Sequence, residues 1–268
     1  IYNMAFYEDK LLFLTRHNNH TYLQLINKDY KTVSSKKVKI DPWNFNSGTS
    51  KWFLSNDNVF LKINDQLFFI KINNDEIEIN LIDSKVEDAA IYNNSIYYIT
   101  SNPNFNVVKQ FDSLNQNKTI SIVEKNDISK IHIFKNKIVV LSSAIGSNTT
   151  IIHLKDTENN DNNKFFINSK IDLIEPYYDN NNLVFLYLKE EGNRYSVASR
   201  DNEGKTTVIS EFKNNLYEPL KLKILDNKIN VFFRNGVFSC FHSGDIFLIH
   251  NESFAKYFNS KNEIKILD

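Results

Sequence analysis

The chain repeats one pattern of apolar and polar positions: a short apolar run, a turn rich in Asn, Asp and Lys, and a second apolar run. The pattern reads IHIFKNKIVVLS at 131–142, and it returns at 4–14, 89–99, 175–186 and 222–233. With the first apolar residue after each turn as an anchor, the anchors are Leu11, Val59, Ile96, Ile138, Leu183 and Ile229. Their spacings are 48, 37, 42, 45 and 46 residues, which predicts six units of about 44 residues.

Each unit contains four short runs of the strand type. In the fourth unit these runs span 130–134, 137–141, 149–154 and 164–168. The second run is apolar on consecutive positions, which predicts a strand buried on both faces. The fourth run alternates, as in Glu76-Ile77-Glu78-Ile79, which indicates a strand with one face in water. Asn and Asp suit the tight turns because they tolerate positive φ.

A repeated four-stranded antiparallel sheet that stacks on its neighbours resembles a blade of the β-propeller superfamily. The resemblance covers the whole chain, 1–268, as a single domain, with blades starting near residues 1, 50, 87, 129, 170 and 218. It is architectural and points to no single family. Trp-Asp dipeptides and paired glycines are absent, and SRDNEGKTT at 199–207 resembles a sialidase Asp-box with one residue too many. The resemblance therefore implies a fold and no catalytic residue.

The C-terminal segment 236–268 leaves the number of blades open. It fits the last two strands of a sixth blade followed by a closing segment. It also fits a compact seventh blade similar to 51–83. We predict six blades and keep seven as the alternative.

Charge and composition exclude several classes of protein. Lys plus Arg equals Asp plus Glu, at 32 each, whereas a protein that binds nucleic acid normally carries an excess of basic residues. The longest apolar run is about six residues, far below the roughly 18 of a membrane span. We therefore expect a soluble domain with neither nucleic acid nor a membrane span. The compartment is open, with a preference for the cell envelope or exterior because the chain begins at a non-methionine residue within a strand-like run.

Metal or thiol chemistry finds little support in the sequence. The single cysteine, Cys240, lies in an apolar run and is expected in the core. His17 and His20 could present two imidazoles, but a metal site needs further ligands that we cannot assign. We expect neither a metal nor another cofactor.

The aromatic residues of the longer loops are the candidate ligand-binding residues. These loops join the second strand to the third and each unit to the next, and rigid scaffolds often place function there. Aromatic rings and amides together suit a peptide or a sugar. Alternatively, these aromatic side chains fill the tops of the blades. The candidates are Trp43, Phe45, Trp52, Asn104, Phe105 and Tyr217.

Acid–base catalysis would need two carboxylates that meet in space. Adjacent acids on a strand point to opposite faces, so only distant pairs could serve. Candidates near the first strands are Glu87, Asp88, Asp172 and Glu218, each of which also fits a surface position. No phosphate loop, G-x-S-x-G elbow or H-E-x-x-H helix is present.

These observations favour a non-enzymatic interaction platform that binds a protein or peptide partner through the longer-looped face. A carbohydrate-binding or carbohydrate-active propeller, with a glycan on the aromatic loops, is the alternative. Enzymatic activity stays uncertain, and we expect none.

Overall fold

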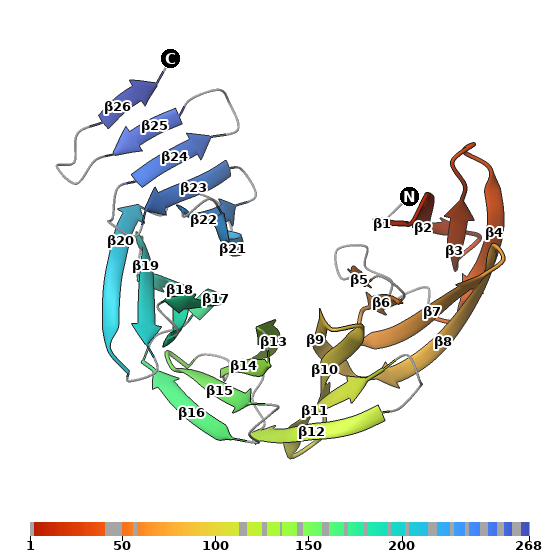
Figure 1. Cartoon of the computed structure of the whole chain (residues 1–268), viewed down its shortest axis with the longest axis horizontal. Helices are drawn as coiled ribbons and strands as arrows, with labels where there is room; N and C mark the ends of the chain where they lie inside the picture. Colours follow the sequence, from red (N-terminus) through yellow and green to blue (C-terminus); the bar gives the residue numbers. More distant parts are fainter. Residues whose placement is uncertain are drawn as a thin grey trace. The chain divides into compact units, whose positions relative to one another are not determined.

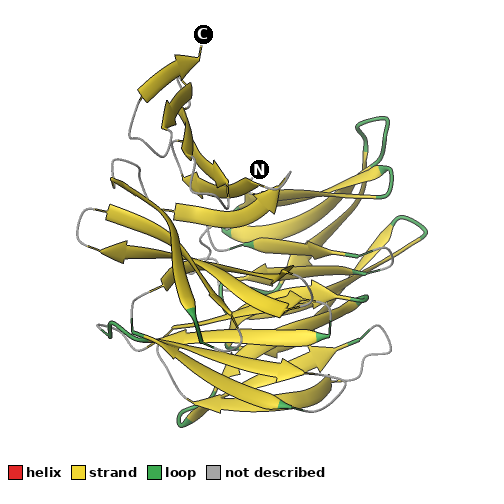
Figure 2. Cartoon of the chain, turned by 60° about the vertical axis from the view of Figure 1, so that its left-hand side comes forward, coloured by secondary structure: helices red, strands yellow, loops and turns green. Residues whose placement is uncertain are grey.

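The computed structural model of the chain consists of strands and turns and has no helix in the part that it describes (Figure 2). No helix there is long and apolar enough to cross a membrane. The predicted all-β class is confirmed. The described residues are 3–40, 50–55, 58–112, 117–124, 128–134, 136–143, 147–156, 161–168, 171–179, 182–191, 194–201, 204–213, 219–225, 228–233, 236–241, 246–250, 255–258 and 264–267.

The first three sheets are four-stranded antiparallel meanders (Figure 1). Sheet 1 contains β1 (Asn3–Tyr7), β2 (Lys10–His17), β3 (His20–Ile26) and β4 (Thr32–Val38). Sheet 2 contains β5 (Lys51–Leu54), β6 (Val59–Ile63), β7 (Gln66–Asn73) and β8 (Glu76–Ser84). Sheet 3 contains β9 (Val86–Tyr92), β10 (Ser95–Ser101), β11 (Phe105–Phe111) and β12 (Asn117–Glu124).

Two further sheets have the same order, and the last is longer. Sheet 4 contains β13 (Ile128–Phe134), β14 (Lys137–Ser143), β15 (Thr150–Asp156) and β16 (Asn162–Ile167). Sheet 5 contains β17 (Ile171–Asp179), β18 (Asn182–Glu191), β19 (Arg194–Asp201) and β20 (Thr206–Lys213). Sheet 6 contains β21 (Pro219–Leu225), β22 (Lys228–Phe233), β23 (Gly236–Phe241), β24 (Ile246–His250), β25 (Ala255–Phe258) and β26 (Ile264–Leu267).

The C-terminal segment departs from the four-strand pattern. β25 pairs with β24 and β26 pairs with β25, so both extend sheet 6 to six strands in the order β21-β22-β23-β24-β25-β26. The physical reason is the short connections, since a short connection lets each strand pair with the one before it. The segment therefore forms no separate seventh sheet among the described strands.

The chain divides into two compact units, and the division falls within sheet 4. Among its described residues, the first unit, 1–145 and 152–164, has three core clusters, each shared by successive sheets. In β6 the side chains of Val59, Leu61 and Ile63 pack in the cluster shared with sheet 1, and Phe60 packs in the cluster shared with sheet 3. Both faces of β6 are thus buried, as the consecutive apolar run predicts.

The second unit, 146–151 and 165–268, has a core between sheets 5 and 6. Leu186 and Leu188 of β18 pack there with Ile229 and Val231 of β22. Burial of β22 alternates between buried and half-buried residues, unlike the continuous burial of β6 and β10. The expectation that every second strand is buried on both faces is therefore wrong for sheet 6.

Asparagine takes the place of glycine in the tight turns. Residues with positive φ in the described turns include Asn18, Asn19, Asn64, Asn74, Asn93 and Asn94. Asn tolerates this left-handed backbone better than most residues with a side chain. The predicted use of Asn in the turns of a glycine-poor chain is confirmed.

Candidate functional site

The first strands of the six sheets share one register position. In each sheet this residue pairs with the residue three places after the anchor of the second strand. The residues at the shared position are Asn3, Lys51, Asp88, Lys130, Glu175 and Lys221. Five of the six are charged, and the sign alternates from Lys51 through Lys221.

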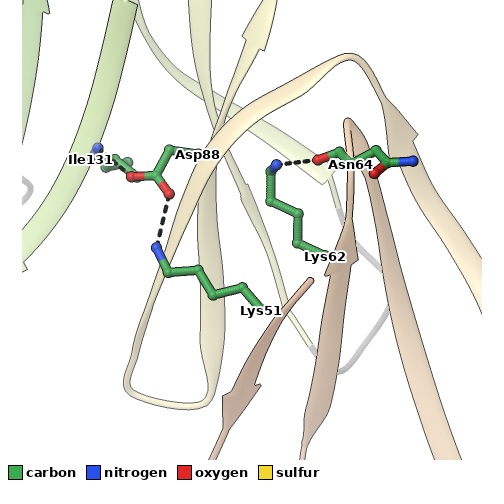
Figure 3. A network of polar contacts seen from close by, with 5 residues as sticks. All are labelled: Lys51, Lys62, Asn64, Asp88 and Ile131. Carbon is green, nitrogen blue, oxygen red and sulfur yellow. Dashed lines mark hydrogen bonds and ion pairs between the residues drawn. The ribbon is translucent and has the colours of Figure 1, made fainter. Parts of the chain in front are cut away.

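Asp88 uses this position to connect three sheets of the first unit (Figure 3). Its Oδ1 lies 3.1 Å from the Nζ of Lys51 on β5. Its Oδ2 accepts a hydrogen bond of 3.1 Å from the main-chain N–H of Ile131 on β13. The Asp88 side chain is 19% exposed and that of Lys51 is 57% exposed. The half-buried carboxylate is therefore the centre of the network, and Lys51 reaches it from solvent.

Lys62 lies opposite Lys51 in the register of β5 and β6. Its side chain is buried, and its Nζ donates to the main-chain carbonyl oxygen of Asn64 (Figure 3). Burial lowers the pKa of Lys62 below its usual 10.5, and Lys51 lowers it further, while Asp88 and Asp65 act in the opposite direction. A buried ammonium group thus lies next to the acidic residues of this region.

A pocket of about 470 Å³ opens at the same end of sheets 2 and 3. Three connections form it: the β6–β7 turn, the β8–β9 junction and the β10–β11 loop. The first and third join a second strand to a third, and the β8–β9 junction joins one sheet to the next, so the pocket lies on the longer-looped face. The lining residues are Asp65, Lys85, Val86, Glu87, Ser101, Asn102 and Pro103.

Main-chain hydrogen bonds fix the three connections to one another. The carbonyl oxygen of Asp65 accepts from the N–H of Lys85 at 2.9 Å and of Val86 at 2.7 Å. The carbonyl oxygen of Lys85 accepts from the N–H of Ser101 at 3.1 Å. Lys85 has a φ of 87°, a left-handed conformation that suits glycine better. This junction holds a strained backbone in place, which is common where the backbone builds a site.

The two acids of the pocket differ from Asp88 in their partners. Glu87 is half-buried, and its Oε2 accepts a hydrogen bond of 3.4 Å from the Nδ2 of the fully buried Asn106. Asp65 is exposed. Within the described residues, neither acid forms an ion pair, whereas Asp88 pairs with Lys51.

The predicted binding residues fall into three groups. Asn104 and Phe105 directly follow Pro103 of the pocket and are exposed, Phe105 by 40%. The N–H of Asn102 donates to the carbonyl oxygen of Phe105 at 3.0 Å and closes this loop. Trp52 is half-buried and packs against the core of sheets 1 and 2, where its indole nitrogen is buried without a hydrogen-bond partner. Trp43, Phe45 and Tyr217 lie outside the described residues.

The other candidates have structural surroundings. His17 and His20 face each other across the β2–β3 hairpin, and the described residues contain no group of three ligands for a metal. Glu218 and the side chain of Asp172 lie outside the described residues. Cys240 is fully buried, as predicted, and burial raises the pKa of its thiol to about 12.

Sequence reasoning missed Glu175. Its Oε1 and Oε2 lie 2.5 and 2.7 Å from the Nζ of Lys223 on β21, within the second unit. The sequence contained a usable signal, because Glu175 stands eight residues before its anchor Leu183, as Asp88 stands eight residues before Ile96.

Comparison with known proteins supports the architecture. No protein-family model matches the chain, and no curated protein matches it. Among solved structures, Kuenenia stuttgartiensis hydrazine synthase has a TM-score of 0.59 at 11% identity, covering 98% of this chain and 94% of that one. Kluyveromyces lactis Hsv2 has a TM-score of 0.58 at 12% identity, covering 99% and 84%.

A prolyl endopeptidase has a TM-score of 0.54 at 10% identity, covering 99% of this chain and 49% of that one. Structural similarity at such low sequence identity is evidence for the fold and not for any activity. Together with six successive antiparallel sheets, they show that the chain has the β-propeller fold.

Proposed function

We propose that this propeller is a non-enzymatic interaction platform that binds a protein or peptide partner through the longer-looped face. The observation that carries the proposal is the pocket of about 470 Å³ between sheets 2 and 3, with the exposed Phe105 beside it at the start of β11. A concave site with a few polar groups and a neighbouring aromatic ring suits a side chain of a partner.

The partners of the inner acids support a binding role over a hydrolytic one. Asp88 is engaged by Lys51 and by the N–H of Ile131, and Glu175 is engaged by Lys223. A carboxylate whose oxygens are already engaged within the protein is poorly placed to exchange a proton with a substrate. The two acids that stand at the shared position thus hold sheets together.

A glycan is the second candidate ligand. Asn102 and Asn104 of the β10–β11 loop provide amides, and Phe105, the first residue of β11, provides an exposed aromatic side chain. This combination can stack on a sugar ring and bond its hydroxyl groups. Trp43, Phe45 and Tyr217 stay predicted contacts for either ligand, whereas Trp52 packs against the core of sheets 1 and 2.

Site-specific photo-crosslinking in cells of the source organism tests the proposal. A photoreactive residue at Asn104 is expected to yield a discrete crosslinked protein, whereas the same residue at Asn74, in the opposite β7–β8 turn, yields none. Equal crosslinking at both positions, or none at Asn104, would contradict a partner on this face. A glycan array with the purified chain separates the second candidate, since selective binding lost in Phe105→Ala supports a sugar.

A further inference from the structure

We propose that the pocket between sheets 2 and 3 accepts a positively charged side chain, a lysine or arginine of the bound peptide. This inference rests on the proposed function and specifies the chemistry of its ligand. It starts from the charges in and around the pocket. Asp65 and Glu87 contribute two carboxylates to the lining, and Lys85 contributes one ammonium.

Two adjacent acids of β9, Glu87 and Asp88, differ in how far their charges are compensated. Asp88 is compensated by the amine of Lys51 and the N–H of Ile131. Glu87, the neighbouring residue at the bulge in β9, receives a single amide hydrogen bond from Asn106, and no ion pair in the described part of the chain. A half-buried carboxylate with so little compensation favours a cation from outside.

Neither Lys85 of the lining nor the nearby Lys62 neutralises these acids. Lys62 lies near Asp65, but its amine donates to the carbonyl oxygen of Asn64, and burial lowers its pKa. Lys85 is exposed, so its charge is screened by water more than that of the half-buried Glu87. Of these two charges, the carboxylate of Glu87 is screened less by water than the ammonium of Lys85, so the pocket favours a cation.

The geometry around the acids also suits a long cationic side chain. Val86 and Pro103 give the pocket apolar wall that can contact the methylene groups of lysine or arginine. Phe105, the first residue of β11, follows the β10–β11 loop and is 40% exposed, and aromatic faces attract cations. Elsewhere in the protein Lys51, Lys71 and Lys109 already lie over aromatic rings.

Amide-resolved NMR titration of the whole chain tests the inference. The probes are acetyl-Gly-Arg-Gly-amide, its citrulline analogue, which has the same shape without the charge, and acetyl-Gly-Glu-Gly-amide. The arginine peptide is expected to shift the amide signals of Val86, Ser101 and Asn102, and to bind about tenfold more tightly than the citrulline peptide. The glutamate peptide is expected to leave these signals unchanged.

Glu87→Gln is expected to weaken the arginine peptide by about tenfold, because it removes the less screened charge. Glu76→Gln, at an exposed position of β8 outside the pocket lining, is the matched control and is expected to bind as the unmodified chain does. Asp65→Asn provides a second variant if Glu87→Gln loses the dispersed spectrum of a folded chain. Equal binding of the three peptides, or shifts that none of these variants changes, would overturn the inference.

The inference and the proposed function can fail separately. A partner crosslinked at Asn104 with a yield that Glu87→Gln leaves unchanged would retain the platform and remove the cationic pocket. Arginine binding at the pocket without any crosslinked partner would contradict the platform and leave the pocket's preference for cations standing.

Discussion

Asp88 and Glu175 stand at the same register position in two sheets: Asp88 pairs with Ile99, and Glu175 pairs with Leu186. Each carboxylate then reaches an amine on another sheet of its own unit, Lys51 for Asp88 and Lys223 for Glu175. The repeat thus places an acid where it can connect neighbouring sheets, in addition to the apolar residues that pack them.

Removal of the Asp88 carboxylate should destabilise the fold. Asp88→Ala leaves the N–H of Ile131 without this acceptor and Lys51 without its partner, so we expect a loss of about 1–3 kcal/mol in the free energy of unfolding. Lys51→Ala should cost less than about 1 kcal/mol, because that amine is largely in solvent. Urea denaturation of both variants measures the difference. Equal losses would show that the ion pair, and not the bond to Ile131, dominates.

The repeat, the strand pattern and the tight turns could be predicted because they depend on local sequence. The apolar run Val59–Leu61 indicates burial on both faces, and the structure buries every residue of Val59–Ile63, including Lys62. The anchors locate the first hairpin of each sheet because each anchor directly follows the turn of that hairpin. The length of sheet 6 could not be predicted, because the pattern of 236–268 fits both an extension of one sheet and a new one.

The candidate site was only partly predictable, because it is assembled by pairing between distant strands. Asn104 and Phe105 were found from their loop, whereas Lys85 and Ser101 meet through a main-chain bond that no local pattern reveals. For Trp52, the local sequence and the packing in the structure point to different roles. An aromatic residue at the start of a first strand suits a binding face, but its ring packs against the core.

Gly204 should be required by the turn that contains it. The residue has a φ of 92°, and a Cβ there would lie 3.1 Å from the Nη2 of Arg200. Asp201 closes this turn by accepting the N–H of Lys205 at 2.8 Å. Gly204→Ala should therefore lower stability by about 1–2 kcal/mol, measured by thermal unfolding.

The β3–β4 turn supplies the matched control for this prediction. Asn27 accepts the N–H of Lys31 there, and Tyr30, with a φ of 59° and 90% exposure, takes the place of Gly204. Tyr30→Gly removes the left-handed strain without removing a core contact, so stability should be unchanged or raised by up to about 1 kcal/mol. A clear loss in Tyr30→Gly would contradict the equivalence of the two turns.

Cys240 should be unreactive in the folded chain. The thiol is fully buried, and burial raises its pKa to about 12, so at pH 8 only about one molecule in ten thousand carries the thiolate. Iodoacetamide should therefore label the native protein far more slowly than the protein in urea, as mass spectrometry would measure. Rapid labelling without denaturant would place the thiol at the surface.

Lys62 should make stability depend on pH in the alkaline range. Burial lowers its pKa in the folded chain, so between that value and 10.5 the unfolded chain binds more protons than the folded chain. The contribution of Lys62 to stability therefore rises with pH through this window, and below it the fold must hold a charged, poorly solvated amine. Lys62→Met should stabilise the protein at pH 7, with a gain that shrinks as pH approaches 10.5.

Urea denaturation of the parent and Lys62→Met at several pH values from 7 to 9.5 tests this dependence through the difference between the two curves. The difference is needed because burial also raises the pKa of Tyr97, Tyr98 and Tyr177, which lowers the stability of both proteins at higher pH. Lys71→Met, which removes a lysine from the middle of β7, is the control and should show no such convergence. A constant difference across the range would show that Lys62 stays charged in the fold.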